Sequence, residues 1–178
     1  TVVHVAVERD PTGAPRRQRS DSAIQRALGQ VIPIQRRLDG KPEVAGNQVV
    51  AAAHAGDLTL ALAAPGPIGC DVEPVAARTK AVWQDLLGRE RYRLAEVIAQ
   101  TTGEDVDTAA TRVWSAGECM KKAGAALHAP LVLDSTNPDG WILLSSGALW
   151  AATVVTQVRD IPDRLVLAVV VRSNHARL

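Results

Sequence analysis

The chain contains no phenylalanine, and aromatic residues make up only 3% of its 178 residues. It therefore lacks the arrays of aromatic and basic side chains on which single-stranded nucleic acids stack. The formal net charge is only +1 at pH 7, so a broadly basic surface for nucleic acid has no support either. We expect no nucleic-acid partner.

Cysteines and long apolar runs are also scarce. Cys70 and Cys119 are too few for a disulfide framework and lack the paired spacing of a metal site, so we expect reduced, buried thiols in a cytoplasmic protein. No stretch approaches ~20 uninterrupted apolar residues, and residues 1–10 lack the layout of a signal peptide, so no membrane partner is expected. The first residue is Thr, which suggests a processed protein or a domain cut from a longer polypeptide.

Basic and acidic residues are unevenly distributed along the chain. Residues 1–41 hold eight of the 20 Lys and Arg residues but only four of the 19 Asp and Glu residues. A basic first part joined to a mildly acidic remainder suits a small polyanionic ligand held between the two. Solvated arginines in a loop are the alternative explanation.

With 47% hydrophobic residues, the chain can bury one core or two small, closely packed halves. Apolar alternation and turn residues predict strands at 2–7, within 48–64 as a pair about an Ala-Gly-Asp turn, at 67–74, within 141–158 as a pair, and at 164–172. Helical spacing and capping residues predict helices at 20–32, 81–100 and 103–127. This order indicates an α+β protein, with two similar halves as one possible arrangement.

The predicted helix at 103–127 has one apolar stripe. Its members recur every three or four residues: Val106, Ala110, Val113, Gly117, Met120, Gly124 and Leu127. At about 100° per residue, Glu118 and Lys122 fall on the opposite, polar face, beside Thr111 and Ser115. A solvated Glu-to-Lys pair worth a few tenths of a kcal/mol is sufficient to explain that face by itself.

A second acidic element favours a functional role for Glu118 and Lys122. Asp71 and Glu73, in the sequence GCDVEP, are one residue apart in a short predicted strand and so project to the same face. Two carboxylates that point together repel each other unless a positive charge lies between them, and a divalent cation with phosphate oxygens supplies one. Three carboxylates from two segments could hold one Mg²⁺; an exposed acidic strand edge is the alternative.

A histidine completes the pattern. His54 lies 17 residues before Asp71, between an apolar run and a Gly-Asp pair, where a lone histidine is commonly structural. The order of His, then Asp-x-Glu, then Trp-Ser-x-x-Glu-x-x-x-Lys resembles that of the 4′-phosphopantetheinyl transferases of the larger, two-half type. Residues 68–73 and 114–122 match the two signature motifs, residues 40–42 resemble the family's Gly-Lys-Pro element, and the resemblance spans residues 20–135.

The resemblance implies a single domain, residues 1–178, in which two similar α+β halves, about 1–78 and 79–178, pack as a pseudo-dimer. It implies transfer of 4′-phosphopantetheine from coenzyme A to a serine of an acyl or peptidyl carrier protein, in polyketide or related natural-product biosynthesis. Asp71, Glu73 and Glu118 would surround Mg²⁺, and Lys122 would meet the phosphates as a catalytic cation. Glu118, directly or through a metal-bound water, is the expected acceptor of the serine proton.

By the same resemblance, Lys41 and His54 would contact the phosphates of coenzyme A. The sequence departs from the family here, because Ala53 and Ala55 replace the serines that usually flank the histidine. Hydroxyl donors to a phosphate are therefore missing, and arginines would have to compensate: Arg26, Arg36 or Arg37.

A second departure lies beside Glu118. Gly117 stands where the family usually has lysine, so Lys121 is expected to take over that contact with phosphate. A glycine inside a helix costs ~1 kcal/mol relative to alanine, which hints that something large approaches the backbone there.

Two other functions remain open. The chain could be a noncatalytic, transferase-like module that docks carrier proteins within a synthase, or a metal-dependent phosphohydrolase that uses the same carboxylates on water. Three carboxylates retained together with Lys122 argue against loss of activity. The basic segment at residues 89–94 is a candidate contact for an acidic carrier helix, and a solvated helix face is the alternative.

Overall fold

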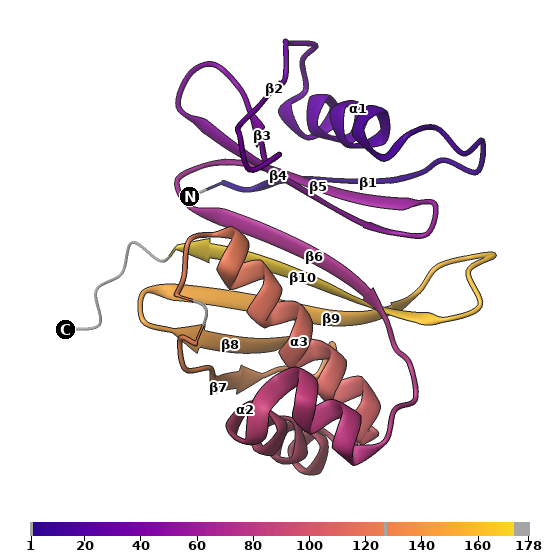
Figure 1. The fold of residues 1–178 in the computed structure, drawn as a ribbon, viewed down its shortest axis with the longest axis vertical. Coiled ribbons are helices and arrows are strands. Elements are labelled where there is room, and N and C mark those ends of the chain that lie inside the picture. Colours follow the sequence, from indigo (N-terminus) through magenta and orange to yellow (C-terminus); the bar gives the residue numbers. More distant parts are fainter. Residues whose placement is uncertain (1, 127, 173–178) are drawn as a thin grey trace.

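The structure is a computed structural model that describes residues 2–126 and 128–172. The described residues form a mixed α+β fold, as predicted, with the strands in three antiparallel sheets (Figure 1). None of the helices in these two ranges is both long and apolar enough to cross a membrane.

The first part of the chain forms a three-stranded sheet covered by one helix. Its strands are, in spatial order, β1 (His4–Arg9), β5 (Leu58–Pro65) and β4 (Gln48–Ala55). Helix α1 (Arg16–Leu28) buries Ala23 and Ile24 against this sheet. The short strands β2 (Gln35–Arg36) and β3 (Pro42–Glu43) pair with each other in the connection between α1 and β4.

The second part forms a five-stranded sheet with two helices. The strands are, in order across the sheet, β6 (Ile68–Pro74), β10 (Arg164–Arg172), β9 (Leu149–Gln157), β8 (Ile142–Ser146) and β7 (Val132–Thr136). Helix α3 (Val106–Lys122) crosses one face of this sheet, and α2 (Lys80–Thr102) packs against α3 (Figure 1). Gly88, at φ 75°, breaks the helical backbone inside α2.

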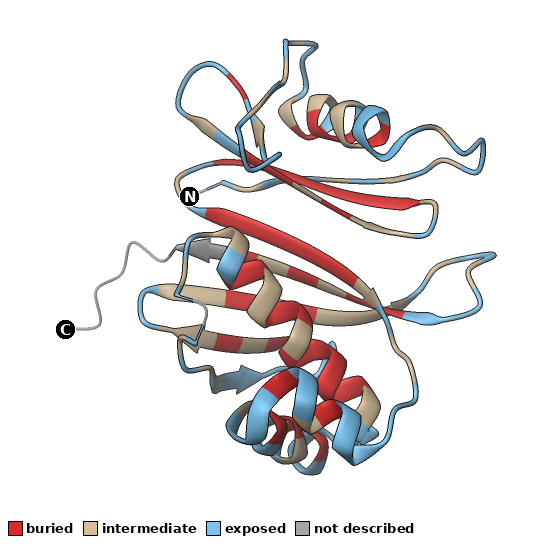
Figure 2. Ribbon diagram, in the orientation of Figure 1, coloured by how far each residue is buried: buried red, intermediate tan, exposed pale blue. Residues whose placement is uncertain are grey.

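Strand β6 joins the two parts. Along its length, Ile68, Cys70 and Val72 pack with the buried leucines of β5, so one face of β6 belongs to the core of the first part. The other face meets α3, because the main chain of Gly69 lies directly against that helix. Both β5 and β6 are buried over most of their length (Figure 2).

The prediction of a polar face on α3 is wrong in part. Thr111 and Ser115 are 2% and 0% exposed, so the face that carries Glu118 and Lys122 is not open to solvent along its length. The physical reason is that α3 is enclosed by α2 on one side and by β6, β10 and β9 on the other. The helix also ends at Lys122, since Gly124 leaves the helical conformation at φ 97°. Leu127, assigned to the apolar stripe, lies outside the described residues.

The predicted bounds of the first helix are also wrong. It was expected at residues 20–32 but runs from Arg16 to Leu28, with Pro15 at its N-cap, and Gly29 ends it at φ 67°. Val31, inside the predicted range, lies beyond this end and is 86% exposed. The earlier start adds one turn to the helix, and that turn carries Arg17 and Arg19.

Candidate functional site

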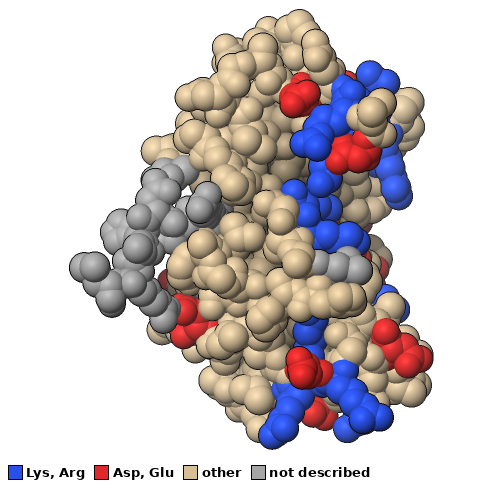
Figure 3. Space-filling view, turned by 60° about the vertical axis from the view of Figure 1, so that its left-hand side comes forward, with Lys and Arg blue, Asp and Glu red and all other residues tan. Residues whose placement is uncertain are grey.

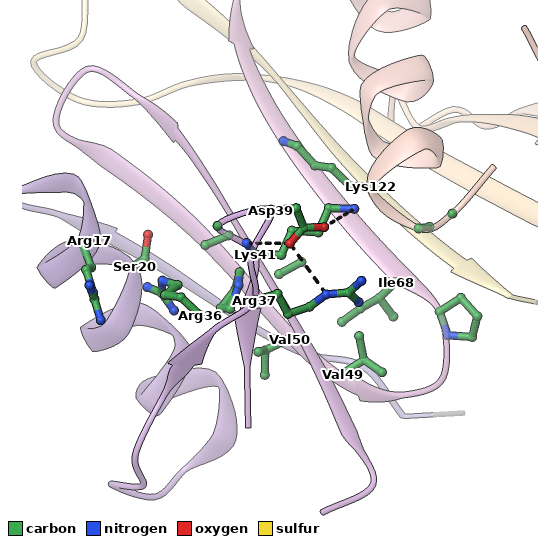
Figure 4. Close-up of a pocket in the computed structure, with 17 residues that line it drawn as sticks. Arg17, Ser20, Arg36, Arg37, Asp39, Lys41, Val49, Val50, Ile68 and Lys122 are labelled. Carbon is green, nitrogen blue, oxygen red and sulfur yellow. Dashed lines mark hydrogen bonds and ion pairs between the residues drawn. The ribbon is translucent and has the colours of Figure 1, made fainter. Parts of the chain in front are cut away.

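A basic groove of about 920 Å³ lies where the two parts of the chain meet. Five cations line it, from α1, from the β2–β3 connection and from the end of α3: Arg17, Arg36, Arg37, Lys41 and Lys122. Asp39 is the one acid among the described residues that line it. Figure 3 shows Lys and Arg gathered along one side of the molecule, and Figure 4 shows the lining residues. The groove is therefore suited to a polyanion.

The turn between β2 and β3 presents two of these cations. The amide of Gly40 donates to the carbonyl of Arg37 at 2.9 Å, and Gly40 adopts φ 80°, which favours glycine. Asp39 forms long ion pairs with both neighbours, 3.6 Å to Arg37 and 3.8 Å to Lys41 (Figure 4). All three side chains are about half exposed, so these pairs are weak and can be exchanged for contacts with an anionic ligand.

Lys122 connects the groove with the acidic residues of β6. Its Nζ donates to Asp71 Oδ1 and to the carbonyl of Cys70, both at 2.8 Å. Burial acts to lower the pKa of Lys122, but the charge and the hydrogen bond of Asp71 outweigh it and the pKa lies above its usual value. Lys122 is therefore a fixed positive charge at the boundary between groove and carboxylates.

The predicted same-face arrangement of the two β6 carboxylates is found in the structure. Asp71 accepts a hydrogen bond from Lys122 of α3. About two helical turns earlier in α3, Trp114 Nε1 donates to Glu73 Oε1 at 3.4 Å. Burial raises the pKa of Glu73, and the charges of Asp71 and Glu118 raise it further. All three predicted metal ligands thus act on one another electrostatically.

One oxygen of this cluster has no donor. Asp71 is 6% exposed, and its Oδ2 is buried without a hydrogen-bond partner among the described residues. Within the same ranges, no three His, Cys, Asp or Glu side chains are arranged as a preformed metal site. Asp71 and Glu118 both raise the pKa of Glu73, and Lys122 is the cation that now neutralises Asp71.

Glu118 and Lys121 lie on a second groove of about 560 Å³. Lys121 Nζ is 3.5 Å from Glu118 Oε1, and Trp114 and Arg91 line the same groove. Lys121 is not a lining residue of the basic groove, so the structure does not bring it together with Lys41 and Lys122 as predicted. Lys121 and Lys122 are adjacent in sequence but line different grooves.

The missing lysine at position 117 has a counterpart from another helix. A Cβ atom added to Gly117 would lie 3.0 Å from Nη1 of Arg91, so the guanidinium of α2 covers this glycine. Arg91 Nη2 also donates to the carbonyl of Ala129 at 2.9 Å. A cation therefore lies beside Glu118 after all, and sequence analysis missed it because Arg91 was assigned to a partner surface.

His54 lies between two hydroxyl groups. Its Nε2 is 2.9 Å from Ser20 Oγ, and its Nδ1 is 2.9 Å from Thr59 Oγ1. Burial lowers the pKa of His54 to about 4, assisted by the positive charges of Arg19, Arg16 and Lys122, so the ring is neutral at pH 7. Of its two hydroxyl partners, Ser20 lines the basic groove, whereas Thr59 is buried.

Of the three arginines predicted to compensate, two line the basic groove and one does not. Arg36 and Arg37 line the basic groove, and Arg36 also pairs with Asp21 of α1. Arg26 does not line it; its guanidinium is 3.1 Å from Glu8 of β1. Arg17 was missed, because it precedes the helix that the sequence pattern predicted.

The two thiols are buried, free cysteines, as predicted. Burial raises the pKa of Cys70 to about 12 and also raises that of Cys119. The Cys119 thiol donates to the carbonyl of Ala168 at 3.2 Å. Neither thiol is available as a nucleophile at neutral pH, because the thiolate is the reactive form.

A scan against models of protein families gives no match to this chain, and a search of curated proteins gives none either.

Proposed function

We propose that the chain transfers 4′-phosphopantetheine from coenzyme A to a serine of an acyl or peptidyl carrier protein. The observation that carries this proposal is the position of Lys122, which lines the basic groove and is bonded to Asp71 of the carboxylate cluster. A polyanionic donor in the groove would thereby place its phosphates beside the residues suited to phosphoryl transfer.

Coenzyme A suits the groove in charge and in size. The molecule carries a pyrophosphate and a ribose 3′-phosphate, and five cations face it against the single carboxylate of Asp39. Apolar side chains of Val49, Val50 and Ile68 also line the groove and offer a surface for the adenine ring. The volume of about 920 Å³ lies at the upper end of the range for small-molecule sites.

The carboxylate cluster fits a divalent cation. Asp71 Oδ2 is buried without a donor among the described residues, and the pKa of Glu73 is raised by burial and by its acidic neighbours, so Lys122 does not fully offset the negative charge of the cluster. Mg²⁺, a hard cation that prefers oxygen ligands, would be held by Asp71, Glu73 and Glu118 and would neutralise the charge of the pyrophosphate.

The chain's own residues account for the remaining steps. Lys122 would place its ammonium against nonbridging phosphate oxygens, where negative charge develops during transfer. Glu118 would accept the proton of the carrier serine as the serine oxygen forms its bond to the phosphorus of the phosphopantetheine phosphate. The bond from that phosphorus to the bridging oxygen breaks, and adenosine 3′,5′-bisphosphate leaves. Arg91, beside Gly117, is a second cation at the Glu118 end.

The order of elements supports a two-half fold. In each part a helix packs on an antiparallel sheet, α1 on β1–β5–β4 and α3 on the sheet that contains β9 and β10. The basic groove takes residues from both parts, as a site between the halves of a pseudo-dimer would. The division at about residue 78 falls in the connection between β6 and α2.

The experiment is an intact-mass measurement on an apo carrier protein incubated with the chain, coenzyme A and Mg²⁺. We expect a gain of about 340 Da, one phosphopantetheine group, which disappears in Asp71→Ala but persists in an Asp57→Asn control, a residue that does not line the groove. Asp57 belongs to the turn between β4 and β5 and pairs with Arg9.

Two results would contradict the proposal. Carrier binding without any gain in mass across several carriers would favour a noncatalytic docking module. Release of adenosine 3′,5′-bisphosphate from coenzyme A at the same rate without carrier protein would favour a phosphohydrolase instead.

A further inference from the structure

Three side chains from three elements form a continuous line from the core of the first part to the basic groove. Thr59 of β5 is 1% exposed, His54 of β4 is half-buried, and Ser20 of α1 lines the groove. Two hydrogen bonds of 2.9 Å join them, one at each nitrogen of the imidazole. The imidazole is therefore fixed at both ends, and the hydroxyl at the groove end is fixed through it.

The hydrogens in this line can be arranged in two ways. Ser20 Oγ also lies 3.0 Å from the carbonyl of Arg16, to which it can donate. If Nε2 of His54 carries the ring proton, it donates to Ser20, Ser20 donates to Arg16, and Thr59 donates to Nδ1. If Nδ1 carries the proton, it donates to Thr59, and Ser20 donates to Nε2. Both nitrogens of the ring have a hydrogen-bond partner in either arrangement.

The first arrangement prepares Ser20 to bind an anion. Its oxygen already accepts a hydrogen bond from the imidazole, and its own hydrogen rests on a helix carbonyl that has another partner in the helix. Rotation of the hydroxyl moves this hydrogen into the groove. Arg17 and Arg36 line the groove near Ser20, so an anion at this point also meets positive charge (Figure 4).

The position of Ser20 selects one phosphate of the donor. In Figure 4, Ser20, Arg17 and Arg36 lie together at one end of the lining residues, apart from Lys122. The proposed transfer takes place at the Lys122 end, where the pyrophosphate belongs. The Ser20 end is left for the phosphate that does not react, the 3′-phosphate of the ribose.

We propose that Ser20 binds the ribose 3′-phosphate of the donor, with its hydroxyl donating to a phosphate oxygen while His54 donates to Ser20 and Thr59 orients the ring. Ser20 would then distinguish coenzyme A from 3′-dephospho-coenzyme A. His54 and Thr59 are positioning residues in this arrangement. The inference rests on the proposed function for the identity of the ligand, but it concerns binding and not transfer.

The test is a titration by calorimetry, without carrier protein or Mg²⁺, of coenzyme A and of 3′-dephospho-coenzyme A. Ser20→Ala is expected to raise the Kd for coenzyme A about tenfold, because a hydrogen bond to a charged group is lost. The Kd for the dephosphorylated compound should stay unchanged. Ser22→Ala, on an exposed position of the same helix, is the matched control and should change neither Kd.

A second variant separates orientation from folding. Thr59→Val keeps the shape of the buried side chain but removes its hydroxyl, so we expect the Kd for coenzyme A to rise about threefold while that for the dephosphorylated compound does not. A loss of general packing would weaken both ligands equally.

The inference is overturned if the wild-type chain binds both compounds equally well or if Ser20→Ala weakens both to the same extent. If the chain binds neither compound, the inference and the proposed function both fail. If Ser20 selects coenzyme A but no carrier protein is modified, the binding inference stands and the proposed transfer fails.

Discussion

A methyl group at position 69 would collide with the main chain of α3. A Cβ atom built on Gly69 lies 2.2 Å from the carbonyl oxygen of Cys119 and 3.2 Å from the amide nitrogen of Ala123. Because both contacts are with backbone atoms, no side chain can rotate away to relieve them. We therefore predict that Gly69→Ala damages the junction between β6 and α3.

The size of the effect follows from the distances. A carbon and an oxygen need a separation of about 3.2 Å, so β6 and α3 would have to move apart by about 1 Å. Overpacking of a core by this amount costs about 1–3 kcal/mol in the free energy of unfolding. The same displacement would disturb the 2.8 Å hydrogen bond between Lys122 and Asp71, because Asp71 is two residues after Gly69 in β6. We therefore expect the transfer rate to fall by up to about 100-fold.

Gly117→Ala is the matched control, since the residue change is identical and only the neighbour differs. At Gly117 the nearest atom is the far end of the Arg91 side chain, which can shift. Alanine also favours the helix by up to about 1 kcal/mol over glycine. Urea unfolding followed by circular dichroism would show Gly69→Ala as less stable and Gly117→Ala as equally or more stable than the wild type. Equal stability of the two variants would refute the reasoning.

Three further predictions concern other parts of the site and its support. Arg91→Ala should lower the transfer rate about tenfold by removing the cation beside Glu118, and Gly117→Lys in the same chain should restore most of it; unchanged rates would exclude this role. Glu104→Gln should lower the free energy of unfolding in urea by about 3 kcal/mol, because the fully buried Arg112 then loses its carboxylate partner. The folded-state pKa of His54, about 4, lies below its ordinary value of 6.5, so its contribution to stability is present above pH 6.5 and is lost as the pH falls toward 4. After allowance for its partial exposure, this contribution is about 1 kcal/mol, and His54→Gln should reduce the difference between unfolding curves at pH 7 and pH 4.5.

The parts of the fold that follow from local patterns were predictable. The Asp-x-Glu spacing placed Asp71 and Glu73 on one face of β6, where they accept hydrogen bonds from Lys122 and Trp114 of α3. Such periodicities depend only on backbone geometry. The start of α1 was not predictable in this way, because Arg16 and Arg17 show no apolar periodicity and Pro15 offers no side-chain cap.

The contacts that complete the site come from elements distant in sequence. Ser20 meets His54, and Arg91 covers Gly117, only because tertiary packing brings their helices to these positions. The burial of Thr111 and Ser115 has the same origin, since a helical pattern cannot indicate how many neighbours enclose a helix. Neither of the two contacts could be read from the sequence, because the partners lie on separate elements.

The pairing of β6 with β10 also has a consequence for how the chain reaches its native state. Asp71 pairs with Ala168, so the strand that carries two of the carboxylates completes its hydrogen bonds only with one of the last strands in the sequence. Contacts of such long sequence separation slow folding, because a long loop must close before they form. During synthesis, β6 emerges early and has no partner strand among the described ones until β10 has left the ribosome. We therefore expect the carboxylates and Lys122 to come together late, with formation of the complete five-stranded sheet.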